Sequence, residues 1–280
     1  MLSCLLNGKR INCIDGEYTR DQLKTWAKKR ILICPACEKP YEYCHGKIKI
    51  PYFRHMDKME CEDRYSEPET DEHLTGKKDL YEWLKNQPRV TDCELEGWIP
   101  GTKQRPDIMF KYNGQQCVLE YQCSPIASEY YERHELYQSA GIQDIWVCGT
   151  KKYFQYYHKG SGSKRVNVLE TESGLYYDCF NKCIYQIDKS IINKSTFDQV
   201  AKGKTYAHVM YNPYDYKIGK VNYYLIKDEL QSYESYKYYP SPTGRPSRKY
   251  PYPYTSYRFD KNVSLAKCMK LQYLQIKNID

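Results

Sequence analysis

Residues 105–123 have the sequence RPDIMFKYNGQQCVLEYQC, and this stretch decides the fold that we expect. Two runs rich in apolar and aromatic residues, 106–112 and 117–123, lie on either side of Asn113-Gly114. Asn-Gly is typical of a two-residue hairpin turn, because both residues tolerate a positive φ. The stretch therefore predicts two antiparallel strands joined by a tight turn.

The turn also sets the register of the two strands. Pairing Tyr112 with Gln115 places Asp107 opposite Glu120, with Cβ atoms ~5 Å apart, and Gln122 points to the same face as Glu120. Two carboxylates at that distance repel each other unless a divalent cation lies between them. A Mg²⁺ or Mn²⁺ ion would polarise a phosphate there and lower the pKa of a bound water, which is the chemistry of phosphodiester hydrolysis.

A structural interpretation of the same carboxylates stays open. In it, Arg105 or Lys103 neutralises the pair across the strands and no metal is needed. The positions of the basic side chains in the fold distinguish the two interpretations.

The segments around the hairpin predict the rest of a core. We expect helices over 69–85 and 128–140, the second ending at Gly141, and strands over 90–96 and 144–148. The order is then helix, three strands, helix, strand. Such an order is typical of an α/β core whose last strand pairs in parallel through a helical crossover.

The first of these helices carries charged residues on its inward side. Ser66 and Glu69 have capping-box spacing and Pro68 falls in the first turn, so the helix is expected to begin there. Inward carboxylates and imidazoles are costly unless they are paired or bound to a metal, so they mark a candidate site. The alternative is a surface ladder of ion pairs at i, i+4 spacing. With a rotation of 100° per residue, one broad face of this helix contains Glu69, Glu72, His73, Gly76, Leu80, Trp83 and Leu84. Lys77 is expected at the edge of that face.

Four residues upstream have the spacing of a zinc site. Cys34 and Cys37 form a CxxC knuckle, and His55 and Cys61 follow 18 and 24 residues after Cys37. Two thiolates from one turn and a second pair from a nearby loop make a tetrahedral Zn²⁺ site, which has no open position and is therefore structural. We expect this metal to be the only core of a hairpin over residues 39–53.

Other cysteines leave the ligand set open. Cys44 and His45 are alternative candidates for the second pair of metal ligands. In a further interpretation, these cysteines are reduced thiols that bind no metal. The chain has 13 cysteines, an odd count, and an N-terminus too polar and short for a signal peptide. This favours metal ligands or free thiols in a cytoplasmic protein. The sequence has no run of about 18 apolar residues, so no membrane span is expected.

Composition points to a polyanionic partner. The formal net charge is +8, which favours nucleic acid without identifying it. Residues 151–280 hold 21 of the 32 tyrosines and a Pro-rich stretch over 239–254, and we expect short strands and loops there. Three interpretations of these tyrosines stay open. In the first, they stack on single-stranded nucleic acid together with the basic residues 245–249. In the others, they form an interface with a partner or a second copy of the chain, or they simply pack within a sheet.

The order of motifs resembles a known family. It runs CPAC (34–37), PYFRH (51–55), Cys61, ETDEHLTGK (69–77), RPD (105–107) and LEYQCS (119–124). This order resembles the CoiA-like competence proteins, which are similar to the PD-(D/E)xK nuclease superfamily. The resemblance covers roughly residues 30–150.

The resemblance implies roles for individual residues. It makes Asp107 and Glu120 the carboxylates that bind the metal, and it places Gln122 where the superfamily has a lysine. Glu72 and His73 then lie on the first core helix, where related nucleases place further metal-site residues. Glutamine cannot donate a proton or carry a positive charge, although it can orient a water by hydrogen bonds.

Four basic or aromatic residues complete the implied site. Lys77 is the candidate to supply the missing positive charge from the helix. Arg133 and Tyr137 match a recurring Arg-xxx-Tyr of the family, and we expect them, with Arg105, to contact nucleic acid.

The sequence thus predicts an α/β (α+β) chain in three parts. A zinc-binding module occupies 1–65, a restriction-endonuclease-like core with a mixed sheet flanked by helices occupies 66–150, and a Tyr-rich accessory region occupies 151–280. The expected function is a Mg²⁺- or Mn²⁺-dependent nuclease acting on DNA in recombination, DNA uptake or phage-related conflict. The alternative is an inactive nucleic-acid-binding protein that retains the fold.

Overall fold

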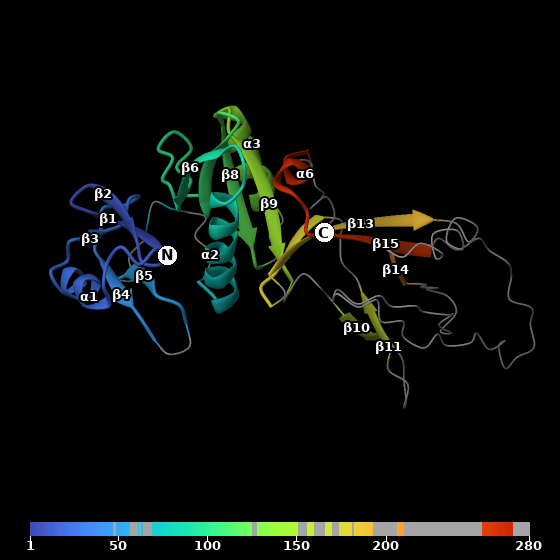
Figure 1. The fold of residues 1–280 in the computed structure, drawn as a ribbon, viewed down its shortest axis with the longest axis horizontal. Helices are drawn as coiled ribbons and strands as arrows, with labels where there is room; N and C mark the ends of the chain where they lie inside the picture. Colours follow the sequence, from blue (N-terminus) through green and yellow to red (C-terminus); the bar gives the residue numbers. More distant parts are fainter. Residues whose placement is uncertain are drawn as a thin grey trace, which may run out of the picture. The chain divides into compact units, whose positions relative to one another are not determined.

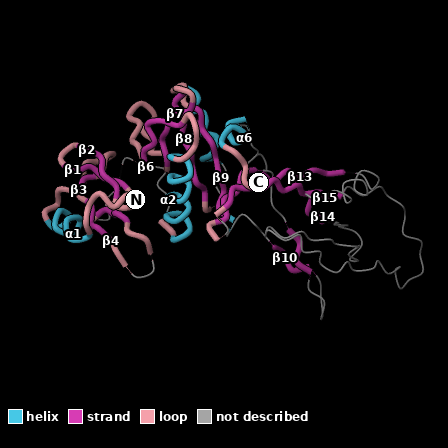
Figure 2. Tube along the Cα trace, in the orientation of Figure 1, coloured by secondary structure: helices cyan, strands magenta, loops and turns pink. Residues whose placement is uncertain are grey.

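The computed structural model describes residues 1–46, 49–56, 61, 63, 69–124, 128–150, 156–159, 166–169, 174–180, 182–192, 206–209 and 254–270. The chain divides into two compact units (Figures 1 and 2). The first contains Met1–Lys151 and Ser264–Tyr273, with Ile279–Asp280, and the second contains Lys152–Val263 and Leu274–Asn278. The fold is mixed α+β, as predicted.

The first unit begins with a small module of short strands around one helix. The helix begins after its N-cap Thr19, whose side chain accepts a hydrogen bond from the backbone N–H of Gln22, while the Gln22 side chain accepts one from the backbone N–H of Thr19. Residues 9–12 form a strand that pairs antiparallel with a first strand over residues 3–6. The elements are β1 (Ser3–Leu6), β2 (Lys9–Asn12), α1 (Arg20–Lys28), β3 (Leu32–Ile33), β4 (Tyr41–Cys44) and β5 (Tyr52–His55).

The β4–β5 hairpin has an apolar core, so the expectation that a metal would be its only core is wrong. Tyr41 and Phe53 are fully buried and stack with ring centroids 6.3 Å apart. They pack into one cluster with β1, β2 and α1, through Cys4, Ile11, Leu23, Ala27, Leu32 and Cys34. The missed strand β1 is the reason, since it supplies the apolar surface that the hairpin alone lacks.

The rest of the first unit has the predicted order of helix, three strands, helix and strand. The sheet runs β9-β8-β7-β6, with β8 and β9 parallel and the other neighbours antiparallel. The mixed sheet flanked by helices is thus confirmed. Its elements are α2 (Asp71–Lys85), β6 (Val90–Leu95), β7 (Ile108–Tyr112), β8 (Gln115–Gln122), α3 (Ser128–Ser139) and β9 (Gln143–Gly149).

The register of the β7–β8 hairpin is the predicted one. Tyr112 pairs with Gln115 and Ile108 pairs with Leu119. The paired residues end there: Asp107 directly precedes β7, and Glu120 lies on β8 next to Leu119, at the end of the hairpin away from the turn.

Helix α2 begins later than predicted. Its N-cap is Thr70, whose hydroxyl accepts a hydrogen bond from the backbone N–H of His73 at 3.1 Å. The capping box with Ser66 is therefore wrong, and Ser66 and Pro68 lie outside the described residues. The capping-box pattern favoured Ser66, because the residue three positions after Thr70 is His73 and not Glu or Gln.

Alternate residues of β8 point toward different helices. Tyr121 packs against α2, where a Cβ added to Gly76 would lie 2.2 Å from the tyrosine ring, so only glycine fits. The neighbouring Glu120 contacts Tyr137 of α3. Because successive side chains of a strand point to opposite faces, α2 and α3 cover opposite faces of β8.

The described residues of the second unit lie mainly in strands, which form a sheet with the order β12-β13-β15-β14 and a separate β10–β11 hairpin. Tyr176, Tyr177 and Tyr185 are buried in it, which fits sheet packing for these three tyrosines. Residues 239–253, with the basic residues at 245, 248 and 249, lie outside the described residues. The elements are β10 (Tyr156–Lys159), β11 (Val166–Leu169), β12 (Gly174–Asp178), β13 (Cys183–Ile192), β14 (Tyr206–Val209) and β15 (Tyr254–Lys261).

Helix α6 (Leu265–Lys270) belongs to the first unit, although the predicted boundary at residue 150 assigned it to the accessory region. Its Met269 carbonyl accepts a hydrogen bond from Gln143 at the start of β9. Within the described part of the chain, no helix is long and apolar enough to cross a membrane.

Candidate functional site

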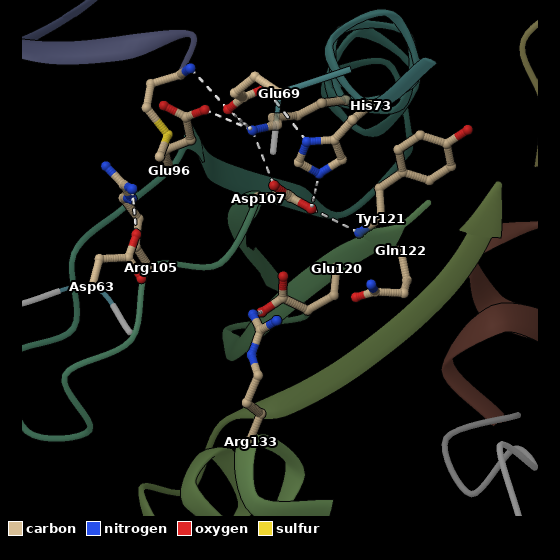
Figure 3. A pocket seen from close by; sticks show the side chains of 12 residues that line it. Asp63, Glu69, His73, Glu96, Arg105, Asp107, Glu120, Tyr121, Gln122 and Arg133 are labelled. Atoms are coloured by element: carbon tan, nitrogen blue, oxygen red, sulfur yellow. Dashed lines mark hydrogen bonds and ion pairs between the residues drawn. The ribbon is translucent and has the colours of Figure 1, made fainter. Parts of the chain in front are cut away.

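One pocket of the first unit is lined almost entirely by charged and polar side chains (Figure 3). It lies where the β7–β8 hairpin, helix α2 and the end of strand β6 come together. The lining residues are Met1, Asp63, Glu69, His73, Lys77, Glu96, Arg105, Asp107, Glu120, Tyr121, Gln122 and Arg133.

Asp107 is at the centre of the hydrogen bonds in this pocket. It precedes β7, and its Oδ2 atom accepts a hydrogen bond from the backbone N–H of Tyr121 at 2.8 Å. His73 Nε2 lies 3.2 Å from the same oxygen, and Lys77 Nζ lies 3.1 Å from Oδ1. The hairpin and helix α2 therefore hold this carboxylate from two sides.

Lys77 is the most deeply buried charged residue of α2, with a side chain 1% exposed, so its predicted position at the edge of the helix face is wrong. Its ammonium lies 2.7 Å from Glu96 Oε1 and 3.2 Å from Glu69 Oε1, in addition to Asp107. A helical wheel gives a direction around the helix axis, but it does not show that three carboxylates from other segments meet there. The ladder of exposed ion pairs is also excluded, since these groups are buried.

The charges of this cluster stabilise one another. Burial by itself lowers the pKa of Lys77, but Asp107, Glu69 and Glu96 outweigh it and raise that pKa well above its ordinary value. Burial raises the pKa of Asp107, and the charges of Lys77 and His73 reverse this and hold the pKa below its usual range. Breaking one partner of such a buried cluster is costly, by about 3–5 kcal/mol.

His73 is protonated in this arrangement. Burial lowers its pKa, but the Asp107 and Glu69 carboxylates together outweigh this effect, and the pKa rises from 6.5 to about 9. His73 Nδ1 and Glu69 Oε2 lie 3.4 Å apart without the geometry of a hydrogen bond. The imidazolium therefore acts as a cation for Asp107.

We expect the charged His73 to make stability depend on pH when no divalent cation is added. Because its pKa is higher in the folded protein, its contribution is complete below pH 6.5 and is lost as the pH rises through about 9. The loss should approach roughly 3 kcal/mol for a fully buried group. Urea unfolding of wild type and His73→Gln across this range measures it, and equal pH slopes in the two proteins would contradict it.

Glu120 is held from the other side of the sheet. Arg133 forms an ion pair with its Oε1 atom, and the Tyr137 hydroxyl donates a hydrogen bond to the same oxygen. Burial raises the pKa of Glu120, more than Arg133 lowers it, and nearby Asp107 raises it further. A divalent cation beside the two carboxylates would favour the charged form of Glu120.

The two carboxylates are thus neutralised by protein cations, as in the structural interpretation, but not by the predicted residues. Lys103 is exposed, and Arg105 pairs elsewhere. Arg133 and Tyr137 are 4% and 0% exposed and bind Glu120, so they are not poised to touch a phosphate directly. Buried Gln104 accepts from Arg133 Nε and fixes the guanidinium further.

Gln122 and Glu72 differ in their relation to the pocket. Gln122 lines it, is 2% exposed, and donates from Nε2 to the carbonyl of Ser124 at 2.6 Å. Glu72 is half-buried and does not line it. Its carboxylate lies against Gly149 of β9, where an added Cβ would be 2.7 Å from Oε1.

Arg105 joins the pocket to the N-terminal module. Its guanidinium forms an ion pair with Asp63, and NH1 donates to the Tyr41 hydroxyl at 3.0 Å. Both charged side chains are almost completely buried, so the structure gives Arg105 an internal role in place of the predicted contact with nucleic acid.

Two acidic residues of the pocket, Asp63 and Glu96, are not among the predicted site residues. Asp63 follows Cys61 by two residues, and Glu96 ends the predicted strand before Gly97. Their partners are 42 and 94 positions away, at Arg105 and Leu2. An acidic residue at the end of a strand next to the hairpin was the available signal for Glu96, and spacing alone carries none for Asp63.

The four predicted metal ligands converge in the N-terminal module. One ligand atom each of Cys34, Cys37, His55 and Cys61 lies within 4.8 Å of all the others. Cys34 Sγ is 3.8 Å from Cys61 Sγ, and Cys37 Sγ is 3.3 Å from His55 Nε2. Cys44 is not part of this group, so among the described residues the geometry selects the predicted set for a metal ion.

Comparison with known proteins agrees with this architecture. Two family models match, the nuclease-like domain of competence protein CoiA over residues 69–217 and its N-terminal domain over residues 16–63. A protein of Bacillus subtilis (strain 168) named "Competence protein CoiA" is 37% identical over 123 residues, which are 44% of this chain and 32% of that protein. The matched part thus spans about a third of this relative, and no solved structure matches the chain significantly. Because the nuclease-like model alone covers more than half of the sequence, the chain belongs to the CoiA family of competence proteins.

Proposed function

We propose that the chain is a nuclease that hydrolyses phosphodiester bonds of DNA with a divalent metal ion. One observation carries the proposal. Asp107 and Glu120 line one buried pocket of a core that has the order helix, three strands, helix, strand, and a buried lysine contacts Asp107. The match to a nuclease-like family model supports the same reaction class.

Asp107, Glu120 and His73 are the residues that would hold Mg²⁺ or Mn²⁺. Carboxylate oxygens suit both ions, and the imidazole would bind after it loses its proton. The bound metal would polarise the phosphate and lower the pKa of an attacking water. Because His73 is protonated without the metal, binding at neutral pH should release a proton.

Lys77 would take the part of the superfamily lysine. Gln122 occupies that position on β8 and carries no charge, whereas Lys77 brings an ammonium to the same pocket from α2. A fixed positive charge next to Asp107 can stabilise the charge that builds up on the phosphate during hydrolysis. Arg133 and Tyr137 would orient Glu120 instead of binding the phosphate themselves.

We propose further that the cluster of Cys34, Cys37, His55 and Cys61 binds a structural Zn²⁺. Two sulfur atoms each ~2.3 Å from zinc at a tetrahedral angle are ~3.8 Å apart, which matches the distance between Cys34 and Cys61. Four protein ligands leave no open position, so this ion would stabilise the module and take no part in hydrolysis.

A cleavage assay tests the proposed activity. Wild-type protein is incubated with labelled single- and double-stranded DNA, linear and circular, with and without Mn²⁺ or Mg²⁺. We expect cleavage only with the metal, and calorimetry should show Mn²⁺ binding at the same site. Metal binding without cleavage of any substrate would favour the alternative of an inactive DNA-binding protein, which Gln122 makes a specific possibility. The first substrates are DNA, because the Bacillus relative is named as a competence protein.

A further inference from the structure

Glu96 is a buried carboxylate that neither the sequence nor the family comparison assigns to a role. It follows the last residue of β6 and is 1% exposed. Its backbone has a φ of 53°, in the left-handed region that side-chain-bearing residues rarely adopt. Strain of this kind persists where surrounding contacts over-determine the residue, so its side-chain contacts deserve a functional explanation.

The two carboxylate oxygens of Glu96 join two different parts of the chain. They accept hydrogen bonds from the backbone N–H groups of Leu2 and Ser3 at 2.8–2.9 Å, and Oε2 also accepts from the Ser3 hydroxyl at 3.2 Å. Oε1 accepts from Lys77 Nζ at 2.7 Å. A single side chain thus ties strand β1 of the N-terminal module to the lysine of the pocket.

Glu96 is the nearest of the three carboxylates around Lys77. The ammonium lies 2.7 Å from Glu96, against 3.1 Å for Asp107 and 3.2 Å for Glu69. Burial raises the pKa of Glu96, and the positive charges of Lys77, the N-terminus and Arg105 together outweigh this and lower it, so the pair is ionised. The backbone N–H groups hold the carboxylate in place, and the carboxylate in turn holds the ammonium.

We propose that Glu96 is the positioning residue for Lys77 and that it makes strand β1 part of the nuclease site. Because the Lys77 ammonium also pairs with Glu96, it does not move closer to Asp107. The oxygens of Asp107 therefore stay accessible to the metal ion. If Glu96 lost its charge, Lys77 would pair more closely with Asp107 and compete with the cation. The inference rests on the proposed metal site at Asp107.

The test measures Mn²⁺ affinity of the full chain without nucleic acid. Glu96→Gln keeps an oxygen that accepts from the backbone of β1 but removes the charge. We expect Mn²⁺ to bind about 10-fold more weakly or worse, as is usual when a residue supporting a metal ligand is replaced. The matched control is Glu94→Gln on the same strand, where the side chain is 49% exposed and pairs with Arg10, and it should bind as wild type does. Unchanged affinity in Glu96→Gln overturns the proposal.

A double-mutant cycle separates positioning from a direct charge effect or a loss of fold. In a Lys77→Met background, Glu96→Gln should change Mn²⁺ affinity by no more than about 2-fold, because no ammonium is left to position. The same fold-change in both backgrounds would show that Glu96 does not act through Lys77. The double variant also removes the buried pair together, which is better tolerated than removing one partner.

A readout without metal distinguishes this inference from the proposed function. The ¹⁵N resonance of the Lys77 ammonium should shift in Glu96→Gln and stay in place in Glu94→Gln. If wild type binds no Mn²⁺ but the resonance shifts as expected, the proposed function fails while the positioning of Lys77 stands. If the resonance does not respond to Glu96→Gln, the positioning role is wrong whatever the protein cleaves.

Discussion

Asp107→Asn is expected to abolish metal-dependent cleavage. The exchange keeps the size of the side chain and an oxygen that accepts from the Tyr121 N–H group, but it removes the charge that would bind the cation. A metal ion contributes several kcal/mol to stabilising the transition state, so the rate should fall by about 10³-fold or more. Binding of DNA measured without metal should change little, because the exchange leaves every lysine and arginine of the chain in place.

The matched control for this variant is Asp92→Asn on β6. The Asp92 side chain is 62% exposed and pairs with Lys111, so the same chemical exchange occurs at a surface ion pair. We expect wild-type cleavage from it. Wild-type rates in Asp107→Asn as well would show that the reaction takes place elsewhere or comes from a contaminant.

Substitution of Asp107 tests the proposed catalysis more specifically than substitution of Glu120 does. Neutralising Glu120 would leave the buried Arg133 without its carboxylate, and an unpaired buried charge costs about 3–5 kcal/mol. A loss of activity in that variant would combine chemistry and unfolding. Asp107 lies among three cationic and donor groups, and Lys77 keeps Glu69 and Glu96 as partners when Asp107 is neutral.

Local signals predicted the β7–β8 hairpin, because its turn depends on residues close in sequence. Asn113-Gly114 determined a turn, and the turn determined the register up to Ile108 and Leu119. The convergence of the cysteines and His55 was likewise predictable, since a CxxC knuckle allows few arrangements of a second pair. These features need only short-range geometry and the chemistry of the ligands.

The surroundings of Lys77 could not be predicted in the same way. Its partners Glu96 and Asp107 are 19 and 30 positions away, and their approach depends on how β6 and β7 pack against α2. Arg133 illustrates the converse. The family resemblance assigned it to the phosphate, but a buried guanidinium beside a buried carboxylate forms the ion pair first. The surroundings of Lys77 and of Arg133 both depend on packing between residues far apart in the sequence, which a local sequence pattern does not specify.

Cys37→Ser is expected to remove zinc and to destabilise the whole first unit. A serine oxygen is a poor ligand where three soft or imidazole ligands remain, so elemental analysis should find about one zinc per chain in wild type and none in the variant. The apolar cluster around Tyr41 and Phe53 should limit the loss to about 4 kcal/mol, or ~10 °C in Tm. Cys44→Ser is the control, because Cys44 lies on β4 of the same hairpin but outside the metal group. It should keep both zinc and Tm.

The effect of losing zinc should extend beyond the module to the proposed catalytic metal. Cys61 is two residues from Asp63, which pairs with Arg105, and Arg105 is in turn two residues from Asp107. Releasing Cys61 therefore frees Asp63 and loosens the segment that places Asp107, so Mn²⁺ affinity should fall together with zinc content. Cys37→Ser protein that lacks zinc but binds Mn²⁺ as tightly as wild type would show that the two sites are independent. Wild-type protein purified without any zinc would refute the structural ion itself.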